Sequence, residues 1–535
     1  MELIADYIVV GAGSAGCVLV DRLSETGASV LLLESGPRDL HPMIHVPAGI
    51  LSLLHNPTVN WNYSSEPEET SGHRRIHWPR GRVLGGSSSI NGMLYVRGNP
   101  ADYDGWSQMG CRGWSFDEVL PYFRKSENYK NDGDPEHRGS DGPLEVEDYR
   151  SVLHLTHAFV EAASQAGHKK SKDLNGAEPE GVGYSQMTRR GRVRGSTART
   201  FLSRAKRRTN IYIETKATAT RLNFDGRRCV GVTFRQYGTD RTAIARREVI
   251  VSGGAVNSPH LLQISGIGPA DHLREIGVEV FHDLPGVGAN LQDHYVARVS
   301  HRVRNAVSIN ELSRGFRLLR EIGIWAFLGK GALTFGVTSA MVFSRSREGL
   351  SSPDLQLLFT PASYSETRFG ELETEPGMTV AVCPVRPASR GVIMANSPDP
   401  MEPPVIRPNY LSDPDDVRVL IAGLRQTREI FLQPAFESFS ARETLPGPDL
   451  QSDNELEMFA REKGGIIYHP VSTCRMGEDP MAVVDPRLKV HGIDRLRIVD
   501  ASIMPTVTTG NTNAPTIMIA EKASDMIIED AKTAI

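Results

Sequence analysis

Cysteine is scarce in this sequence, which has only Cys17, Cys111, Cys229, Cys383 and Cys474. Their number is odd, they are scattered, and no two of them form a Cys-x-x-Cys pair. This pattern indicates neither a disulfide framework nor a zinc site. We therefore expect reduced thiols in a cytosol-like compartment and no metal.

Long apolar runs are missing as well. No stretch of about 18 uncharged apolar residues occurs, so no membrane-spanning helix is expected. The first six residues, Met-Glu-Leu-Ile-Ala-Asp, lack the basic segment with which a signal peptide begins. These two absences predict a cytoplasmic location.

A surplus of basic charge is also lacking. The chain has 60 Lys and Arg against 64 Asp and Glu, a net charge of −4, which argues against a dedicated nucleic-acid-binding protein. With 39% hydrophobic and 23% charged residues the chain is not typical of disorder. Its 535 residues suffice for two or three domains with cores of their own. Glycine, by contrast, is plentiful at 50 residues and is clustered in short motifs.

The first 35 residues are typical of a dinucleotide-binding unit. An apolar run over 7–10 predicts a buried strand. The motif Gly-Ala-Gly-Ser-Ala-Gly follows at 11–16, and a helical pattern occupies 17–24. A second strand is expected over 29–33 and ends at Glu34. The order strand, Gly-rich turn, helix, strand and acid predicts a βαβ unit.

Each glycine of the motif has an expected role. Gly11 would allow the tight turn, Gly13 the close approach of a pyrophosphate, and Gly16 the contact between helix and strand. Glu34 would accept hydrogen bonds from the adenosine ribose hydroxyls. The motif alone does not separate FAD from NAD(P).

Later segments repeat the glycine-rich style. Residues 78–92 predict a loop that enters a helix near Ser87, where N–H groups could face an anion. A strand over 248–252 also runs into glycines, and a helix is expected to begin at 257–259. From about 311 to 455 the glycine motifs thin out and strand-like segments alternate with prolines, which predicts a separate sheet-containing domain.

The C-terminal part offers a candidate base. His469 follows an apolar strand, and Pro470 biases its backbone toward an extended geometry. A neutral imidazole over a redox cofactor could take the hydroxyl proton of an alcohol while a hydride leaves its carbon. The amide of Asn513, at the start of the last helix, could hydrogen-bond the same oxygen.

Taken together, these residues resemble the glucose–methanol–choline (GMC) family of FAD-dependent oxidoreductases over nearly the whole chain. Residues 81–92, Gly-Arg-Val-Leu-Gly-Gly-Ser-Ser-Ser-Ile-Asn-Gly, are similar to the first family signature, and 253–268 to the second. His469-Pro470 and the run Asn-Ala-Pro-Thr at 513–516 match the catalytic histidine and its His-or-Asn partner. In style the chain is most similar to bacterial choline, alcohol, sorbose and polyethylene glycol dehydrogenases.

The resemblance implies an α/β fold, α+β overall, with two domains. A Rossmann-like FAD-binding domain would comprise 1–155, 190–310 and 456–535. A substrate-binding domain of antiparallel sheet plus helices would comprise 156–189 and 311–455.

The same resemblance implies residue roles. His469 would be the base and Asn513 the second catalytic residue, with hydride passing to flavin N5. Some family members attach FAD covalently through a histidine at the position of Ile90, so we expect non-covalent FAD here. The residues expected to bind FAD are Gly11, Gly13, Ser14, Ala15, Gly16, Glu34, Arg82, Gly85, Gly86, Asn91, Gly92, Met93, Leu94, Ala219, Gly254, Asp500, Ala501, Asn511, Pro515 and Thr516.

Several alternatives stay open at this stage. The leading hypothesis is a dehydrogenase that converts a primary alcohol to the aldehyde and passes electrons to a quinone, a cytochrome or an artificial acceptor. An oxidase that uses O2 is the alternative, and a flavin-fold lyase or a non-redox binding protein is a hypothesis of another class. Peripheral association with the cytoplasmic membrane and a homodimer are both compatible with the resemblance.

The substrate is the least determined feature. A choline site would need an aromatic cage and a carboxylate, and Trp325, Phe335, Phe359 and Tyr364 could contribute the cage. Linear alcohols, polyether alcohols, sugars and choline all remain open, and we favour a neutral primary alcohol.

Overall fold

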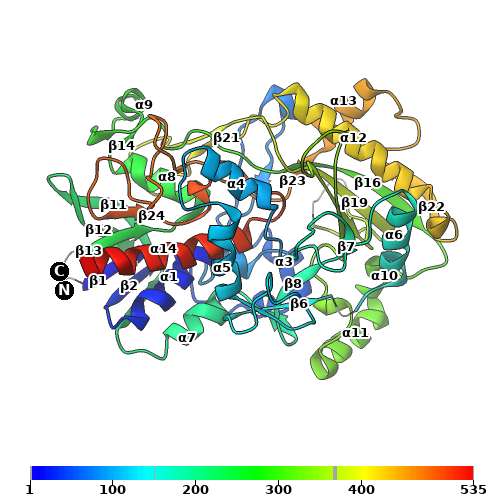
Figure 1. Cartoon of the computed structure of the whole chain (residues 1–535), viewed down its shortest axis with the longest axis horizontal. Helices are drawn as coiled ribbons and strands as arrows, with labels where there is room; N and C mark the ends of the chain where they lie inside the picture. The colour runs from blue at the N-terminus through cyan, green and yellow to red at the C-terminus, as the bar shows by residue number, and fades with distance from the viewer. Residues whose placement is uncertain (1–2, 150, 366–369, 534–535) are drawn as a thin grey trace.

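Two large sheets occupy opposite ends of the molecule in a computed structural model that describes residues 3–149, 151–365 and 370–533 (Figure 1). One sheet is mixed and the other is antiparallel. Among the described helices, none combines the length and the apolarity that crossing a bilayer requires. The predicted fold class is confirmed.

The first sheet has the strand order β10-β2-β1-β13-β12-β11, with β24 beside β13. Its parallel centre is made of β10, β2, β1, β13 and β24, and the hairpin strands β11 and β12 extend it in antiparallel fashion. The strand bounds are β1 (Leu3–Val10), β2 (Val30–Glu34), β10 (Ile211–Thr215), β11 (Ala217–Asp225), β12 (Arg228–Gln236), β13 (Thr239–Val251) and β24 (Leu496–Ile498).

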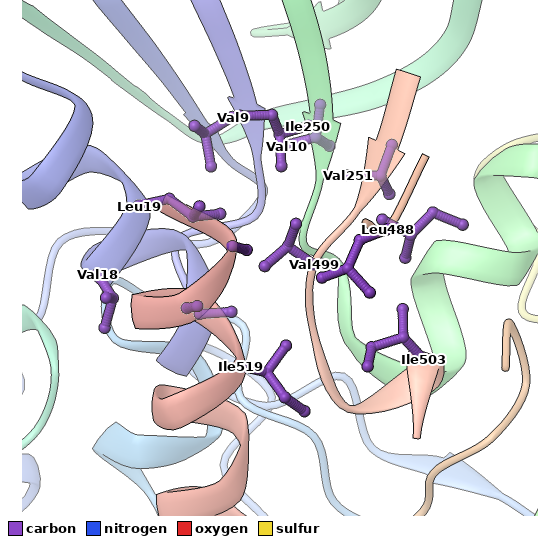
Figure 2. Packing of buried hydrophobic residues seen from close by; sticks show 14 of the residues in the cluster. Val9, Val10, Val18, Leu19, Ile250, Val251, Leu488, Val499, Ile503 and Ile519 are labelled. Carbon is purple, nitrogen blue, oxygen red and sulfur yellow. The ribbon is translucent and has the colours of Figure 1, made fainter. Parts of the chain in front are cut away.

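Helices from the two ends of the chain cover one face of this sheet. α1 (Ser14–Glu25) and α14 (Asn513–Thr533) lie side by side in Figure 1. Figure 2 shows Leu19 of α1 and Ile519 of α14 in one apolar cluster with residues of β1 and β13. Arg22 Nε donates to Glu521 Oε2 at 2.7 Å. The last helix is therefore held in the dinucleotide unit that the first residues begin.

The second sheet has the order β22-β16-β19-β18-β17-β7, with β23 beside β16, and all its pairs are antiparallel. Helices α6 (His154–Gln165) and α12 (Pro414–Phe431) pack against it. The strand bounds are β7 (Gly181–Tyr184), β16 (Tyr295–Val303), β17 (Ala340–Ser344), β18 (Leu355–Thr360), β19 (Gly377–Pro384), β22 (Ser440–Leu445) and β23 (Gly465–Ile466).

A third sheet of four strands, β5-β6-β8-β9, and several shorter elements complete the fold. These strands are β5 (Glu127–Tyr129), β6 (Leu144–Asp148), β8 (Gln186–Arg190) and β9 (Val193–Arg194). The longer of the remaining helices are α4 (Pro100–Gln108), α5 (Phe116–Ser126), α8 (Gly254–Ile264), α9 (Ala270–Glu275), α11 (Gly315–Leu328) and α13 (Asp453–Lys463).

The proposed domain boundaries stay a prediction, and sheet membership differs from them in two places. β16 and β23 fall in the stretches assigned to the FAD-binding domain, yet both pair in the second sheet. Sheet membership would therefore move one boundary from 310 to just before Tyr295 and the other from 455 to just after Ile466.

Helix α8 begins earlier than the sequence predicted, at Gly254 instead of 257–259. Pro259 consequently lies inside the helix and cannot donate to the carbonyl of Ala255 four residues back. The hydroxyl of Thr473 donates to that carbonyl instead, at 2.7 Å. A tertiary hydrogen bond thus compensates for a helix position that proline normally destabilises.

Candidate active site

One cavity of about 390 Å³ joins the two ends of the predicted site. It reaches from Glu34 at the end of β2 to His469 beyond β23. The predicted residues that line it are Gly11, Gly13, Ser14, Ala15, Glu34, Gly86, Asn91, Gly92, Met93, Leu94, Ala219, Gly254, His469, Asp500, Ala501, Asn511, Asn513 and Thr516.

Four predicted cofactor residues do not line this cavity: Gly16, Arg82, Gly85 and Pro515. The guanidinium of Arg82 lies over the ring of Trp61, 4.7 Å from its centroid, and the N–H of Gly85 donates to the carbonyl of Ala12 at 2.7 Å. These two residues therefore shape the loops beside the cavity. Gly16 does the same by packing closely against the backbone of Gly11.

The three motif glycines differ in what surrounds them. Gly11 has φ +100°, and a Cβ there would lie 2.5 Å from Ser252 O. At Gly16 a Cβ would lie 1.9 Å from Gly11 O, whereas at Gly13 nothing lies within 4 Å. These surroundings match the roles that the motif predicted. Gly11 lies in the turn, Gly16 lies at the contact of the helix, and Gly13 leaves an open approach to the cavity.

Glu34 lies at the dinucleotide end of the cavity. Its Oε2 accepts from the N–H of Ala12 at 2.9 Å and its Oε1 from the N–H of Gly36 at 2.8 Å. Burial raises the pKa of this carboxyl to about 7, against the lowering effect of the two N–H donors. Each oxygen keeps a further lone pair, so ribose hydroxyls could still donate to it.

Asp500 fixes the start of α8 at the same edge of the first sheet, just beyond the carboxyl end of β24. Its Oδ2 accepts from Gly254 N at 2.8 Å and from Ser258 Oγ at 2.6 Å, and its Oδ1 accepts from Ser502 N at 2.8 Å. Burial raises the pKa of this carboxyl. Asp500 thus holds the end of β24 and the glycine-rich start of α8 together at the cavity wall.

His469 sits in a hydrogen-bonded chain whose proton positions can be deduced. The carbonyl oxygen of Val385 can only accept, so His294 Nε2, 3.2 Å away, carries a hydrogen. Burial lowers the pKa of His294 to about 4, so that imidazole is neutral at pH 7 and its Nδ1 is an acceptor.

The same reasoning assigns the tautomer of His469. His294 Nδ1 lies 2.9 Å from His469 Nδ1, and because the first is an acceptor the second must donate. Burial, followed by the electrostatic effect of His294 and Arg80, holds the pKa of His469 well below its usual range. His469 lines the cavity and is neutral, so its Nε2 keeps the lone pair that a general base would need.

The backbone around His469 is held firmly as well. The N–H of His469 donates to Asp293 Oδ1 at 2.6 Å, and the hydroxyl of Tyr410 donates to Asp293 Oδ2 at 2.6 Å. Burial raises the pKa of Asp293 to about 6. Tyr468 has φ +67°, a strained value for an aromatic residue, and its carbonyl accepts from Arg80 Nη2 at 2.7 Å.

The side-chain amide beside His469 is that of Asn511, whereas the sequence motif predicted Asn513 there. Asn511 Nδ2 lies 3.0 Å from His469 Nε2. Asn513 Oδ1 instead accepts from Ser14 Oγ at 2.7 Å, in the glycine-rich loop before α1. Asn513 begins α14 while Asn511 lies in the preceding turn, so the two amides point to different parts of the cavity.

Sequence reasoning missed the groups that hold the candidate base His469 in place. Asp293 and His294 immediately precede β16, and an Asp-His pair before a strand is a weak signal by itself. Their contact with His469 spans about 175 residues of chain, which a single sequence does not reveal. Arg298 of β16 was also missed, and it lines the cavity beyond His469.

The aromatic residues considered for a choline cage are dispersed. Phe335 packs edge-on against Tyr149, and Phe359 stacks on Phe159 with ring centroids 4.4 Å apart. Trp325 lies on α11, and of the four only Tyr364 lines the described part of the cavity. In the ranges 3–149, 151–365 and 370–533, no cluster of His, Cys, Asp and Glu could hold a metal ion.

Two family models match the chain, and both describe GMC oxidoreductases. The N-terminal model covers residues 5–296 and the C-terminal model covers 387–520. The chain belongs to the GMC oxidoreductase family. The predicted resemblance is confirmed, and the chain is an oxidoreductase.

Relatives of the GMC chain align over nearly its full length. Mitochondrial choline dehydrogenase of Homo sapiens is 44% identical, over 97% of this chain and 89% of the relative. Alcohol dehydrogenase [acceptor] of Pseudomonas putida is 42% identical, over 98% of this chain and 95% of the relative.

Solved GMC structures share its fold. Pyridoxine 4-oxidase from Mesorbium loti superposes with a TM-score of 0.89 at 30% identity, covering 97% of this chain and 98% of that one. Formate oxidase gives a TM-score of 0.93 at 27% identity and covers 100% of both chains.

FAD is the cofactor that family membership and these flavin-containing neighbours indicate. The cavity fits it: Gly13 leaves room for a pyrophosphate, Glu34 lies where a ribose is expected, and His469 faces the other end. A Cβ on Gly86 would lie 2.6 Å from Gly13 Cα, so two glycine-rich loops meet at the middle of the dinucleotide path. The predicted cofactor is thereby supported by the protein's own geometry.

Proposed function

We propose that this protein oxidises a primary alcohol to the aldehyde, with FAD as the hydride acceptor and a quinone or another acceptor reoxidising the cofactor. The observation that carries the proposal is the pair made by His469 Nε2 and Asn511 Nδ2, 3.0 Å apart, in the same cavity as the dinucleotide loops. The relative named alcohol dehydrogenase [acceptor] supports the same chemistry.

The chain's own residues would manage the proton. The alcohol hydroxyl would donate to His469 Nε2 and accept from Asn511 Nδ2, separating two groups that now bond to each other. As the O–H bond breaks, its proton passes to Nε2 while Nδ1–H stays bonded to His294. Asn511 stabilises the charge that develops on oxygen. Bound FAD supplies the acceptor for the hydride that leaves the alcohol carbon.

The substrate half of the cavity favours a neutral alcohol over choline. Arg80 and Arg298 contribute guanidinium groups there, and burial lowers the pKa of both. Arginine side chains stay protonated in proteins. The described carboxylates on the cavity lining are Glu34, Glu402 and Asp500. Two of these, Glu34 and Asp500, sit on dinucleotide loops. The third, Glu402, lies near His260 of α8, where burial lowers the pKa of the imidazole and the Glu402 charge raises it. A quaternary ammonium would need an aromatic cage with a carboxylate close by.

FAD is held without a covalent bond in this proposal. Ile90, at the position that carries the linking histidine in some family members, is a buried side chain packed among Ile44, Leu53, Val59 and Val83. It offers no nucleophile. Acid precipitation is expected to release all the flavin into the supernatant, and flavin that remained with the precipitate would contradict this point.

An oxidase is the second candidate, because the solved neighbours include proteins named pyridoxine 4-oxidase and formate oxidase. The residues that handle the proton would be unchanged. Only the acceptor that reoxidises the flavin would differ.

One experiment tests the proposal and separates the candidates. The purified holoprotein is mixed without oxygen with a linear alcohol, a polyether alcohol, sorbose or choline, and the visible flavin absorbance is followed. We expect bleaching by a neutral primary alcohol, and recolouring by a quinone faster than by air. Bleaching by none of the four, with FAD bound, would overturn the proposal, and rapid recolouring by air would favour the oxidase.

A further inference from the structure

Helix α11 presents its apolar side to solvent. Five large apolar residues on its 14 positions are exposed, whereas the other exposed large apolar residues are scattered along the described chain. Phe316 is 83% and Phe327 is 88% exposed. Isolated apolar residues on a surface are ordinary, but a contiguous set indicates an interaction site. In Figure 1 the helix lies at the lower right edge of the molecule, beside α10 (Ile309–Leu312).

The exposed residues form one stripe along the helix. At 100° per residue, Phe316, Leu319, Ile322 and Phe327 fall within an arc of about 140°, and Leu328 adds a fifth side chain at the end. A helix that covered the core would turn such a stripe inward. Here it faces outward.

Polar contacts hold the other side of the helix to the protein. Glu321 is buried, and its Oε2 accepts from the N–H of Ala332 at 2.7 Å. Trp325 Nε1 donates to the carbonyl of Arg192 at 2.9 Å, and Arg192 lies over the Trp325 ring. The orientation of α11 is therefore fixed, and the stripe cannot be buried by rotating the helix.

Basic residues border the stripe. Arg320 and Lys330 are exposed next to it, and Arg317 is exposed although it pairs with Glu311 at 2.8 Å. The only carboxylate on α11 itself is the buried Glu321. An apolar stripe flanked by cations matches the interface of an anionic bilayer, where acyl chains lie below phosphate headgroups.

A second copy of the chain fits this surface less well. The helix is about 21 Å long, so its outer face offers roughly 200 Å², well below the ~800 Å² that each partner of a stable dimer buries. A twofold contact would also bring Arg320 and its copy onto the same small face.

We propose that α11 is a docking surface for an anionic lipid membrane. Phe316, Leu319 and Phe327 would enter the headgroup boundary while Arg320 and Lys330 contact lipid phosphates. The helix would lie in the plane of the membrane surface. Nine residues after the helix, Val337 lines the active-site cavity, so docking would bring that wall close to apolar molecules dissolved in the bilayer. The docking surface does not depend on the proposed alcohol oxidation.

Vesicle flotation tests this surface with the full-length holoprotein. The vesicles are phosphatidylcholine alone or phosphatidylcholine with about a quarter phosphatidylglycerol, which sets a negative surface potential. The test variants are Phe316→Ser/Phe327→Ser and Arg320→Glu. The matched control is Leu432→Ser/Met458→Ser, which removes one exposed apolar side chain from the C-terminal cap of α12 and one from α13. Flavin absorbance and the melting midpoint verify that each variant is folded.

We expect the wild type and the control to float with the anionic vesicles and to bind them at least tenfold less in ~1 M salt. The double Phe variant should bind at least tenfold less than the wild type, and Arg320→Glu should lose its preference for anionic lipid. Wild-type protein that does not float, or a double Phe variant that floats equally well, would overturn the proposal. So would a wild-type dimer in gel filtration that the double Phe variant dissolves, because the stripe would then be a contact between copies.

Discussion

At the residue scale, the proposed chemistry depends on which amide faces His469, the candidate base. Asn511 and Asn513 are two residues apart, yet one contacts His469 and the other contacts Ser14. A motif match could not distinguish them, because both lie in the same polar turn before α14. Their different neighbours make their roles experimentally separable.

Replacing each asparagine by leucine should give two different defects. We expect Asn511→Leu to slow flavin reduction by alcohol by ~10²–10³, the cost of removing one hydrogen-bond donor to a developing oxyanion, with FAD content unchanged. Asn513→Leu should mainly weaken FAD binding, because it frees Ser14 in the pyrophosphate loop. Flavin absorbance and anaerobic reduction rates measure the two effects. Equal slowing in both variants, at equal FAD content, would refute this assignment.

His294 acts as a positioning residue in this account, since it fixes the tautomer of His469 through the 2.9 Å contact between their Nδ1 atoms. His294→Leu removes the acceptor, and kcat should fall ~10–100-fold with little change in KM. His294→Asn keeps an acceptor oxygen near the same place and should restore most of the rate. If the Asn variant is as slow as the Leu variant, while both bind FAD normally, the hydrogen bond is not what matters.

Asp293 should set the acid limb of the pH profile. Burial raises its pKa to about 6, while the Tyr410 hydrogen bond opposes that rise. Above pH 6 the carboxylate can accept from Tyr410 and from the N–H of His469, and below it the added proton disrupts both contacts. We therefore expect kcat/KM to fall below about pH 6.

Tyr410→Phe removes the hydrogen bond that lowers the pKa of Asp293, so the acid limb should move to higher pH. Tyr129→Phe is the matched control, because Tyr129 makes a similar 2.7 Å bond to Asp148 in the four-stranded sheet. The acid limb of the kcat/KM profile of Tyr129→Phe should stay at the wild-type pH. A limb that does not move in Tyr410→Phe, or moves to lower pH, would show that another group controls activity.

At the scale of elements, much of the fold was predictable from local patterns. The strand–glycine–helix–strand order predicted β1, α1 and β2 because each step has a strong local signature. The start of α8 was not predictable, because it depends on a hydroxyl from Thr473 more than 200 residues away.

The contact between α1 and β1 depends on Gly16. Gly16→Ala would place a Cβ 1.9 Å from the carbonyl oxygen of Gly11, so the helix must move away from the strand. We expect at least tenfold weaker FAD binding and a free energy of unfolding lower by ~1–3 kcal/mol, the usual cost of overpacking. Retained flavin after gel filtration and denaturant unfolding measure these changes.

Gly105 of α4 provides the control for that substitution. It has open space around its Cβ position, so Gly105→Ala should bind FAD normally and be more stable by ~0.4–1 kcal/mol. Normal flavin content in Gly16→Ala would show that the helix tolerates the clash without disturbing the site.

At the scale of the whole molecule, the candidate active site lies between the two large sheets. The first sheet supplies the dinucleotide loops, and β16 of the second sheet carries Arg298 to the cavity. His294, just before β16, contacts His469 from behind the cavity wall. The FAD loops and His469 could be predicted from the sequence because each is a contiguous motif. It could not locate Asp293, His294 or Tyr410, because their common neighbour is reached only through tertiary folding.

The central claim is that His469 is the base that removes the alcohol proton. The most direct test is the rate of anaerobic flavin reduction in His469→Ala, compared with the wild type at equal FAD content and with the alcohol that bleaches the wild-type flavin best. The account predicts a fall of ~10²–10⁴, the usual contribution of general base catalysis. A variant that keeps its full FAD and reduces it at a near-normal rate would contradict the account, since the proton would then leave to another group.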